Sequence, residues 1–189
     1  MLAAEHQDVG RTSVKLKFAF LAAVFLVGTS AVAAALLGAT PGAPVRVDER
    51  CIAADTRIIV SLKSHALLLC DRGNMIETFG VRLGRGGIGK TREGDGKTPV
   101  STYSLGEPRP SNRFGIFIPI GFPTEEQKKA GYTGSAVGVH GPPRWAKWLG
   151  RLVNTFDLSD GCVGVARDDE IEKIAAWVRT AAARTIELR

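Results

Sequence analysis

Two residues in the C-terminal third of the chain, His140 and Cys162, have side chains suited to covalent catalysis. Cys162 follows a glycine in residues 159–165 (SDGCVGV), and a turn there can expose the sulfur and gather backbone N–H groups at one point. A thiol needs a nearby base to react at neutral pH, and histidine is the usual one. Residue types alone leave two other interpretations open: Cys162 as a small core residue, and His140 as a structural residue at a strand end.

A metal site and a nucleotide site have weaker support. His140, Cys162 and Asp160 lack a fourth ligand and a spacing typical of metal sites, so no metal is expected. Residues 84–91 (GRGGIGKT) match the bare pattern of a phosphate-binding loop. A phosphate-binding loop must be followed directly by a helix. Residues 92–96 (REGDG) contain two glycines, which disfavour a helix at this place. We therefore interpret the match as accidental.

The N-terminal part of the chain predicts export. Residues 18–40 carry no charge and follow three basic residues, Arg11, Lys15 and Lys17. They can be a cleaved signal peptide, with Ala31–Ala33 as the cleavage site, or an uncleaved anchor in the inner membrane, since about 20 residues span a bilayer. Residues 1–17 then form a cytoplasmic n-region, and the chain after residue 40 faces the periplasmic side of the cell envelope.

The three cysteines fit an oxidising compartment. Two can pair and one is left over, and we expect the pair to be Cys51 and Cys70. If residues 57–62 and 65–71 form a hairpin, Cys70 lies opposite the start of the first strand, within reach of Cys51. The alternative is that Cys70 is simply buried in the sheet.

The chain beyond a linker at residues 41–55 predicts a mainly β (α+β) domain at 56–189. Its glycines and prolines, 22 and 9 in the whole chain, favour many turns. Strands are expected at 57–62, 65–71, 75–83, 97–105, 114–120, 137–141 and 185–188. Residues 168–183 predict a helix with one apolar face, and a short helix is expected at 124–130. Residues 142–158 form a long connection.

The net charge of +6 is spread along the chain. The sequence has no zinc finger, no RNP-type aromatic motif and no basic helix, so nucleic acid is not an expected partner. A mildly basic surface suits anionic envelope polymers or lipid headgroups.

The spacing of the two reactive residues resembles the signature of the L,D-transpeptidase catalytic domain, or YkuD domain. In this chain 18 residues separate His140 from Ser159, which begins the run Ser-Asp-Gly-Cys. Residues 94–99 (GDGKTP) are similar to the family's entry to a strand ending in Tyr, here Tyr103. Two positions depart from the usual pattern: Asp160 stands where many members have His, as in a [Ser/Thr]-Asp-Gly-Cys subgroup, and Gly164 where many have Arg.

This resemblance implies a β-sandwich with one C-terminal helix and assigns roles at the site. Cys162 is the nucleophile and His140 the base, oriented by the carbonyl of Gly141, while the N–H groups of Gly161 and Cys162 hold the oxyanion. No cofactor is needed. The candidate substrate-binding residues are Tyr103, Phe114, Trp145, Trp148, Ser159 and Asp160. Two of them, Trp145 and Trp148, lie with Phe156 on the connection between His140 and Cys162, where they form either a lid over the substrate or packing onto the sheet.

The function implied is a peptidoglycan L,D-transpeptidase, which attacks a tetrapeptide stem through a thioester and passes the acyl group to a second stem. Two alternatives remain open. One is a hydrolytic relative, an L,D-carboxypeptidase or cross-link hydrolase, and the other is a membrane-tethered module that binds peptidoglycan without catalysis. A papain-like peptidase is disfavoured because it would place Cys before His in the sequence.

Overall fold

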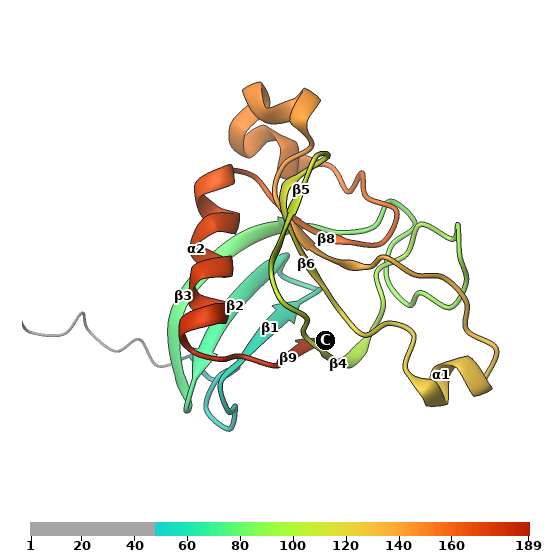
Figure 1. Ribbon diagram of the computed structural model, residues 1–189, viewed down its shortest axis with the longest axis horizontal. Coiled ribbons are helices and arrows are strands. Elements are labelled where there is room, and N and C mark those ends of the chain that lie inside the picture. Colours follow the sequence, from blue (N-terminus) through green and yellow to red (C-terminus); the bar gives the residue numbers. More distant parts are fainter. Residues whose placement is uncertain (1–47) are drawn as a thin grey trace, which may run out of the picture. The chain divides into compact units, whose positions relative to one another are not determined.

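The computed structural model describes residues 48–189, and most of its elements are short strands (Figure 1). The strands are β1 Arg57–Ser61, β2 Ala66–Asp71, β3 Asn74–Arg82, β4 Ser101–Ser104, β5 Arg109–Ser111, β6 Gly115–Pro119, β7 Gly138–His140, β8 Val163–Val165 and β9 Thr185–Leu188. The helices are α1 Glu125–Lys129, the 3₁₀-type segment η1 Arg144–Thr155 and α2 Asp168–Thr180. Among these described residues no helix has the length and apolarity to cross a membrane, and the expected signal or anchor at 18–40 lies outside them.

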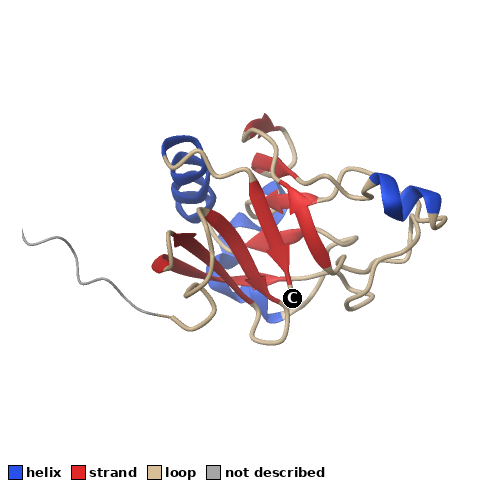
Figure 2. Ribbon diagram, turned by 90° about the horizontal axis from the view of Figure 1, so that it is seen from below, coloured by secondary structure: helices blue, strands red, loops and turns tan. Residues whose placement is uncertain are grey.

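One nine-stranded sheet runs in the order β4-β9-β1-β2-β3-β8-β7-β6-β5. Its first part is the expected antiparallel meander of β1, β2 and β3. The sheet curls on itself, because a bridge between Leu105 and Ile120 joins the chain after β4 to the chain after β6. Figure 2 shows α1 and α2 at opposite ends of the curled strands. The predicted mainly β class with one long C-terminal helix is confirmed.

Both faces of β1 and β2 are apolar, and both are covered. Ile58 and Leu67 belong to the main core. The helix α2 adds a stripe of buried residues to that core, namely Ile171, Ile174, Ala175 and Val178. Ile59 and Leu68 pack on the opposite face, in a second cluster with Cys51 and Cys70.

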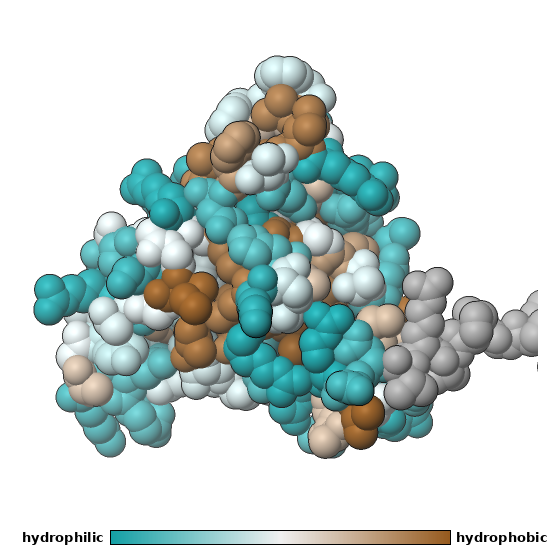
Figure 3. All heavy atoms as spheres, turned by 180° about the vertical axis from the view of Figure 1, so that it is seen from behind, coloured by the Kyte–Doolittle hydropathy of each residue, from teal (hydrophilic) through white to brown (hydrophobic). Residues whose placement is uncertain are grey.

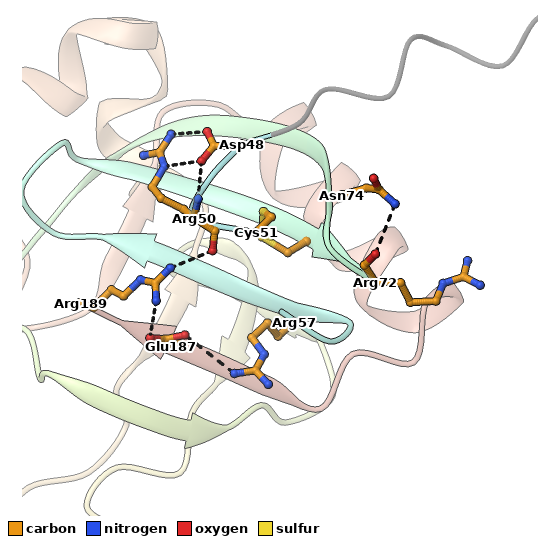
Figure 4. Close-up of a disulfide and its surroundings, with 9 residues drawn as sticks. Asp48, Arg50, Cys51, Arg57, Arg72, Asn74, Glu187 and Arg189 are labelled. Atoms are coloured by element: carbon orange, nitrogen blue, oxygen red, sulfur yellow. Dashed lines mark hydrogen bonds and ion pairs between the residues drawn. A yellow bond between two sulfur atoms is a disulfide. The ribbon is translucent and has the colours of Figure 1, made fainter. Parts of the chain in front are cut away.

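A disulfide fixes the chain that covers this second face (Figure 4). Cys51 and Cys70 are bonded, and their Cα atoms lie 5.5 Å apart, within the usual range of about 4.4–6.8 Å. The C-terminal residue Arg189 donates a hydrogen bond of 2.8 Å to the carbonyl of Arg50. These contacts attach Arg50 and Cys51, which belong to the segment expected as a linker, to the sheet.

The helix α2 starts at the expected residue and ends earlier than expected. At its start the Glu170 carboxylate accepts the backbone N–H groups of Ala166 at 3.0 Å and Arg167 at 3.1 Å. These contacts satisfy two backbone donors at the helix entrance, of which the one at Ala166 is buried. The helix stops at Thr180 and not at 183, because Ala182 adopts a left-handed φ of 52° and turns the chain into β9.

Four elements differ from the expectation, namely β4, β5, β8 and η1. β5 and β8 were not predicted, since three residues are too few to show alternation, and β5 contains Pro110, which an edge strand tolerates. The connection at 142–158 contains η1, two 3₁₀ helices joined by a kink at Gly150 with φ 51°. The expected strand at 97–105 is restricted to Ser101–Ser104.

Candidate active site

The two reactive residues lie on adjacent parallel strands. β7 and β8 pair Val139 with Val163 and His140 with Gly164. His140 ends β7, and Cys162 immediately precedes β8. Both side chains line one cavity of about 470 Å³, which we call the His–Cys cavity. Other residues of its wall include Arg82, Phe114, Trp145, Ser159 and Asp160.

His140 is held as a neutral base. Its Nδ1 lies 2.7 Å from the carbonyl oxygen of Gly141. A carbonyl can only accept, so Nδ1 carries the proton and Nε2 keeps its lone pair. Burial lowers the pKa of His140 to about 4, and the positive charges of Arg82 and Arg113 act in the same direction, while the bond to Gly141 opposes them. The Phe114 ring stacks on the imidazole, with the ring centroids 3.7 Å apart.

Cys162 carries the free thiol of the chain, since the other two cysteines are bonded. Burial raises the pKa of this thiol above its usual value of 9.0, although a backbone hydrogen bond from Gly138 and the charge of Lys90 lower it. The sulfur donates to the carbonyl of Ala136 at 3.5 Å. At neutral pH the resting pair is therefore a thiol and a neutral imidazole, which suits base-assisted attack on a carbonyl carbon.

Glycine is required at the position before Cys162. Gly161 has a φ of 121°, and a Cβ there would lie 2.4 Å from the carbonyl oxygen of Lys97. The Gly161 N–H, expected as an oxyanion donor, already donates to the Ser159 hydroxyl at 3.1 Å. It can serve an oxyanion only if that contact opens.

Ser159 and Asp160 shape the turn that carries Cys162. The Ser159 hydroxyl lies 2.7 Å from the Cys162 carbonyl, to which it donates. Asp160 is exposed and forms an ion pair of 2.8 Å with Arg85. Both residues line the His–Cys cavity, so they are placed where a substrate can reach them.

The structure does not bring Tyr103 to this cavity. Its ring is buried against Phe122, and its hydroxyl accepts a hydrogen bond of 3.0 Å from Gln127. Tyr103 lines a separate hollow beside α1. Tyr103 was expected to bind substrate, and its side chain does not line the His–Cys cavity.

The aromatic residues of the connection are exposed. Trp145 is 69%, Trp148 81% and Phe156 66% accessible, so none of them packs deeply onto the sheet. Only Trp145 of these three lines the His–Cys cavity. Figure 1 shows η1 as the orange segment projecting at the top, and Figure 3 shows apolar residues gathered on that projection.

Two buried cations beside the cavity were not anticipated. Arg82, the last residue of β3, is 2% exposed. Lys90 is 5% exposed and forms an ion pair of 2.9 Å with Asp95. Lys90 stands in the string that resembles a phosphate-binding loop, but no helix follows it in the structure. No signal in the sequence marked Arg82, a lone charged residue between Val81 and Leu83 at the end of β3. Among residues 48–189 no group of three or more His, Cys, Asp or Glu side chains is arranged to hold a metal.

Comparisons with known proteins bear on the whole domain. By structure the chain is similar to the helical cell shape determining protein Pgp2 from Campylobacter jejuni, with 22% identity and a TM-score of 0.57 over 70% of this chain and 46% of that one. It is also similar to Bd1075 from Bdellovibrio bacteriovorus, with 23% identity and a TM-score of 0.51 over 70% and 47%. The matched part thus spans less than half of each of those chains, and at this identity it shows a shared fold.

A comparison with curated protein sequences gave no match. The sequence model described as the L,D-transpeptidase catalytic domain (YkuD) matches residues 55–186, a stretch that contains both His140 and Cys162. Because this match covers more than half of the chain, the protein belongs to the L,D-transpeptidase catalytic domain family.

Proposed function

We propose that this protein is a cysteine acyl transferase that acts on the peptide stems of peptidoglycan as an L,D-transpeptidase. One observation carries the proposal: a buried neutral histidine with a free Nε2 and the free thiol of the chain line the same cavity. The family supports the substrate class. The fold shared with a cell-shape protein makes cell shape the phenotype to examine.

In the first half-reaction Cys162 attacks the carbonyl carbon of the stem's L,D-peptide bond. His140 Nε2 takes the thiol proton as the carbon–sulfur bond forms. The carbon–nitrogen bond then breaks, and the imidazolium returns the proton to the leaving amine of D-alanine. The Gly141 carbonyl, which accepts from Nδ1, stabilises the transient imidazolium, the part that Asp plays in a serine triad.

In the second half-reaction the thioester is resolved by a nucleophile that loses its proton to His140. An amine of a second stem gives a cross-link, and water gives a hydrolysed stem. The same groups serve both outcomes, so the acceptor that enters the cavity decides between transpeptidase and hydrolase.

The cavity wall fits an anionic peptide. Two arginines, Arg109 and Arg113, line it together with a single carboxylate, Asp160, and the buried Arg82 adds a third positive charge to the wall. Guanidinium groups recognise carboxylates well, and stem peptides carry several. For the oxyanion we assign the Cys162 N–H, joined by the Gly161 N–H when that group leaves Ser159.

We also propose that the domain works on the periplasmic side of the cell envelope. The Cys51–Cys70 disulfide supports an oxidising compartment. Export would depend on residues 18–40, as a cleaved signal or as an anchor in the inner membrane, with residues 1–17 in the cytoplasm.

The nucleophile can be tested by substitution. Cys162→Ala should reduce stem turnover at least about a thousandfold, because the covalent step is lost. Mass spectrometry of peptidoglycan fragments after incubation measures turnover and identifies the acceptor. Intact mass after carbapenem treatment, an acylation that the family implies, should shift for the wild type and not for this variant.

A matched pair of histidine variants provides the control. His140→Ala should abolish turnover. His65→Ala should not, because His65 is absent from the cavity wall and faces Asp157 at 3.6 Å. Carbapenem adducts or product formation that persist in Cys162→Ala would place the nucleophile elsewhere.

A further inference from the structure

Arg82 is a buried cation that forms no ion pair within residues 48–189, although the negative charge of Asp157 acts on it from nearby. Within residues 48–189 its guanidinium contacts only neutral oxygens: Nη1 lies 2.9 Å from the Val165 carbonyl and 3.4 Å from Asn154 Oδ1, and Nη2 lies 3.4 Å from the Gly141 carbonyl. Burial lowers the pKa of Arg82 to about 10. Burying an unpaired charge is unfavourable for folding, so a role in the site would explain why it is there.

Gly164 makes room for this guanidinium. Across the sheet, Gly164 of β8 pairs with Arg82 of β3 on one side and with His140 of β7 on the other. Side chains directly opposite on neighbouring strands point to the same face, so Arg82 and His140 share a face with only a glycine between them. A Cβ at Gly164 would lie 2.5 Å from Arg82 Cζ.

The guanidinium thus contacts the carbonyl that orients His140, and its charge acts on both the imidazole and the thiol. It donates to the Gly141 carbonyl, which also accepts from His140 Nδ1. Its positive charge opposes protonation of the imidazole, and it attracts a thiolate at Cys162. Three other charged groups face this corner from neighbouring elements: Arg113, in the turn between β5 and β6, Asp157, in the loop between η1 and β8, and Asp168, at the start of α2.

We propose that Arg82 is the positioning residue of this site: reaching across Gly164, its guanidinium fixes the Gly141 carbonyl that orients the His140 imidazole toward Cys162. The proposal rests on the proposed roles of His140 and Cys162. Arg82 acts through these residues and forms no bond with substrate.

The test is an NMR titration of the His140 ring in the full chain, which has only three histidines. Arg82→Met should shift the midpoint of His140 upward by roughly one pH unit, because a nearby positive charge is removed. Arg82→Lys retains the charge and should stay near the wild-type midpoint. Arg184→Met removes an exposed arginine, paired with Glu107, that is absent from the cavity wall, and should leave the midpoint unchanged.

Gly164 offers a second way to move the guanidinium if Arg82→Met does not fold. Gly164→Ala places a methyl group against Arg82 and should also shift the His140 midpoint upward. The double variant Arg82→Ala/Gly164→Arg returns a guanidinium from the neighbouring strand and should restore a midpoint close to wild type. A folded Arg82→Met or Gly164→Ala protein with an unchanged His140 midpoint overturns the proposal.

The titration needs no substrate, so it separates this proposal from the proposed function. A protein that shows the expected shifts but neither converts stems nor forms a thioester would retain the role of Arg82 in setting the histidine and lose the transpeptidase assignment. If instead the wild type converted stems but the His140 midpoint did not move in the Arg82 variants, the transpeptidase assignment would stand and the role of Arg82 would be lost.

Discussion

At His140 and Cys162, burial moves the two pKa values in opposite directions. It lowers the pKa of His140 to about 4 and raises that of Cys162 above 9.0. The proton therefore stays on the sulfur of Cys162 at neutral pH, and no thiolate–imidazolium pair is formed beforehand. The Gly141 carbonyl and the Phe114 ring fix the imidazole instead, so that Nε2 can take the proton during attack.

This arrangement predicts an unusual pH dependence for Cys162. Alkylation by iodoacetamide, a neutral reagent, follows the thiolate, so its rate should keep rising through pH 9. Stem turnover needs neutral His140, so its acid limb should lie near pH 4, well below the ordinary histidine value of 6.5. The rates are measured by intact mass and product analysis across pH. An alkylation plateau between pH 5 and 8 would indicate a preformed ion pair and contradict the structure.

At the residue scale, the sequence predicts those parts of the site that lie in local motifs. His140 and Cys162 could be found because each is adjacent to a glycine at a recognisable spacing. Arg82 could not, because nothing in the sequence tells that a lone arginine ends a strand beside the cavity. Gly164 was visible only as a departure from the family pattern, and the structure explains it through Arg82.

At the element scale, strands joined by short turns can be predicted from the sequence, whereas strands that depend on long-range pairing cannot. β1, β2 and β3 were predictable, because apolar runs alternate with two short turns. β8 is three residues long and exists because β3 and β7 lie on either side of it. The segment η1 buries only small or branched residues, Ala146 and Val153, and leaves its tryptophans outward.

The outward tryptophans predict separate effects on activity and stability. Trp145→Ala should reduce stem turnover about tenfold, because this ring forms part of the cavity wall, while the melting temperature stays near wild type. Trp148→Ala, which removes a more exposed ring from the same segment, should have a smaller effect on turnover. Turnover is measured on stem peptides and melting by circular dichroism. A large loss of melting temperature with unchanged specific activity would assign Trp145 to packing.

At the scale of the whole domain, the two ends of the described chain stabilise the same sheet. β9 pairs in parallel with β1, and Arg189 donates to the backbone of Arg50. Figure 4 shows this contact beside the disulfide, on the face of β1 and β2 that faces away from the main core. The His–Cys cavity lies on other strands, β7 and β8, so the disulfide should influence stability without direct influence on the chemistry.

The disulfide therefore predicts a loss of stability that leaves the site intact. The bonded cysteines are 19 residues apart, and a loop of about this size contributes roughly 3 kcal/mol to the free energy of unfolding. Cys51→Ala/Cys70→Ala, or reduction of the wild type, should lower the melting temperature by on the order of 10 °C. Below that temperature the alkylation rate of Cys162 should equal that of the oxidised protein.

Thiol counting under denaturing, non-reducing conditions should give one free thiol per chain, and a count of three would rule out the disulfide.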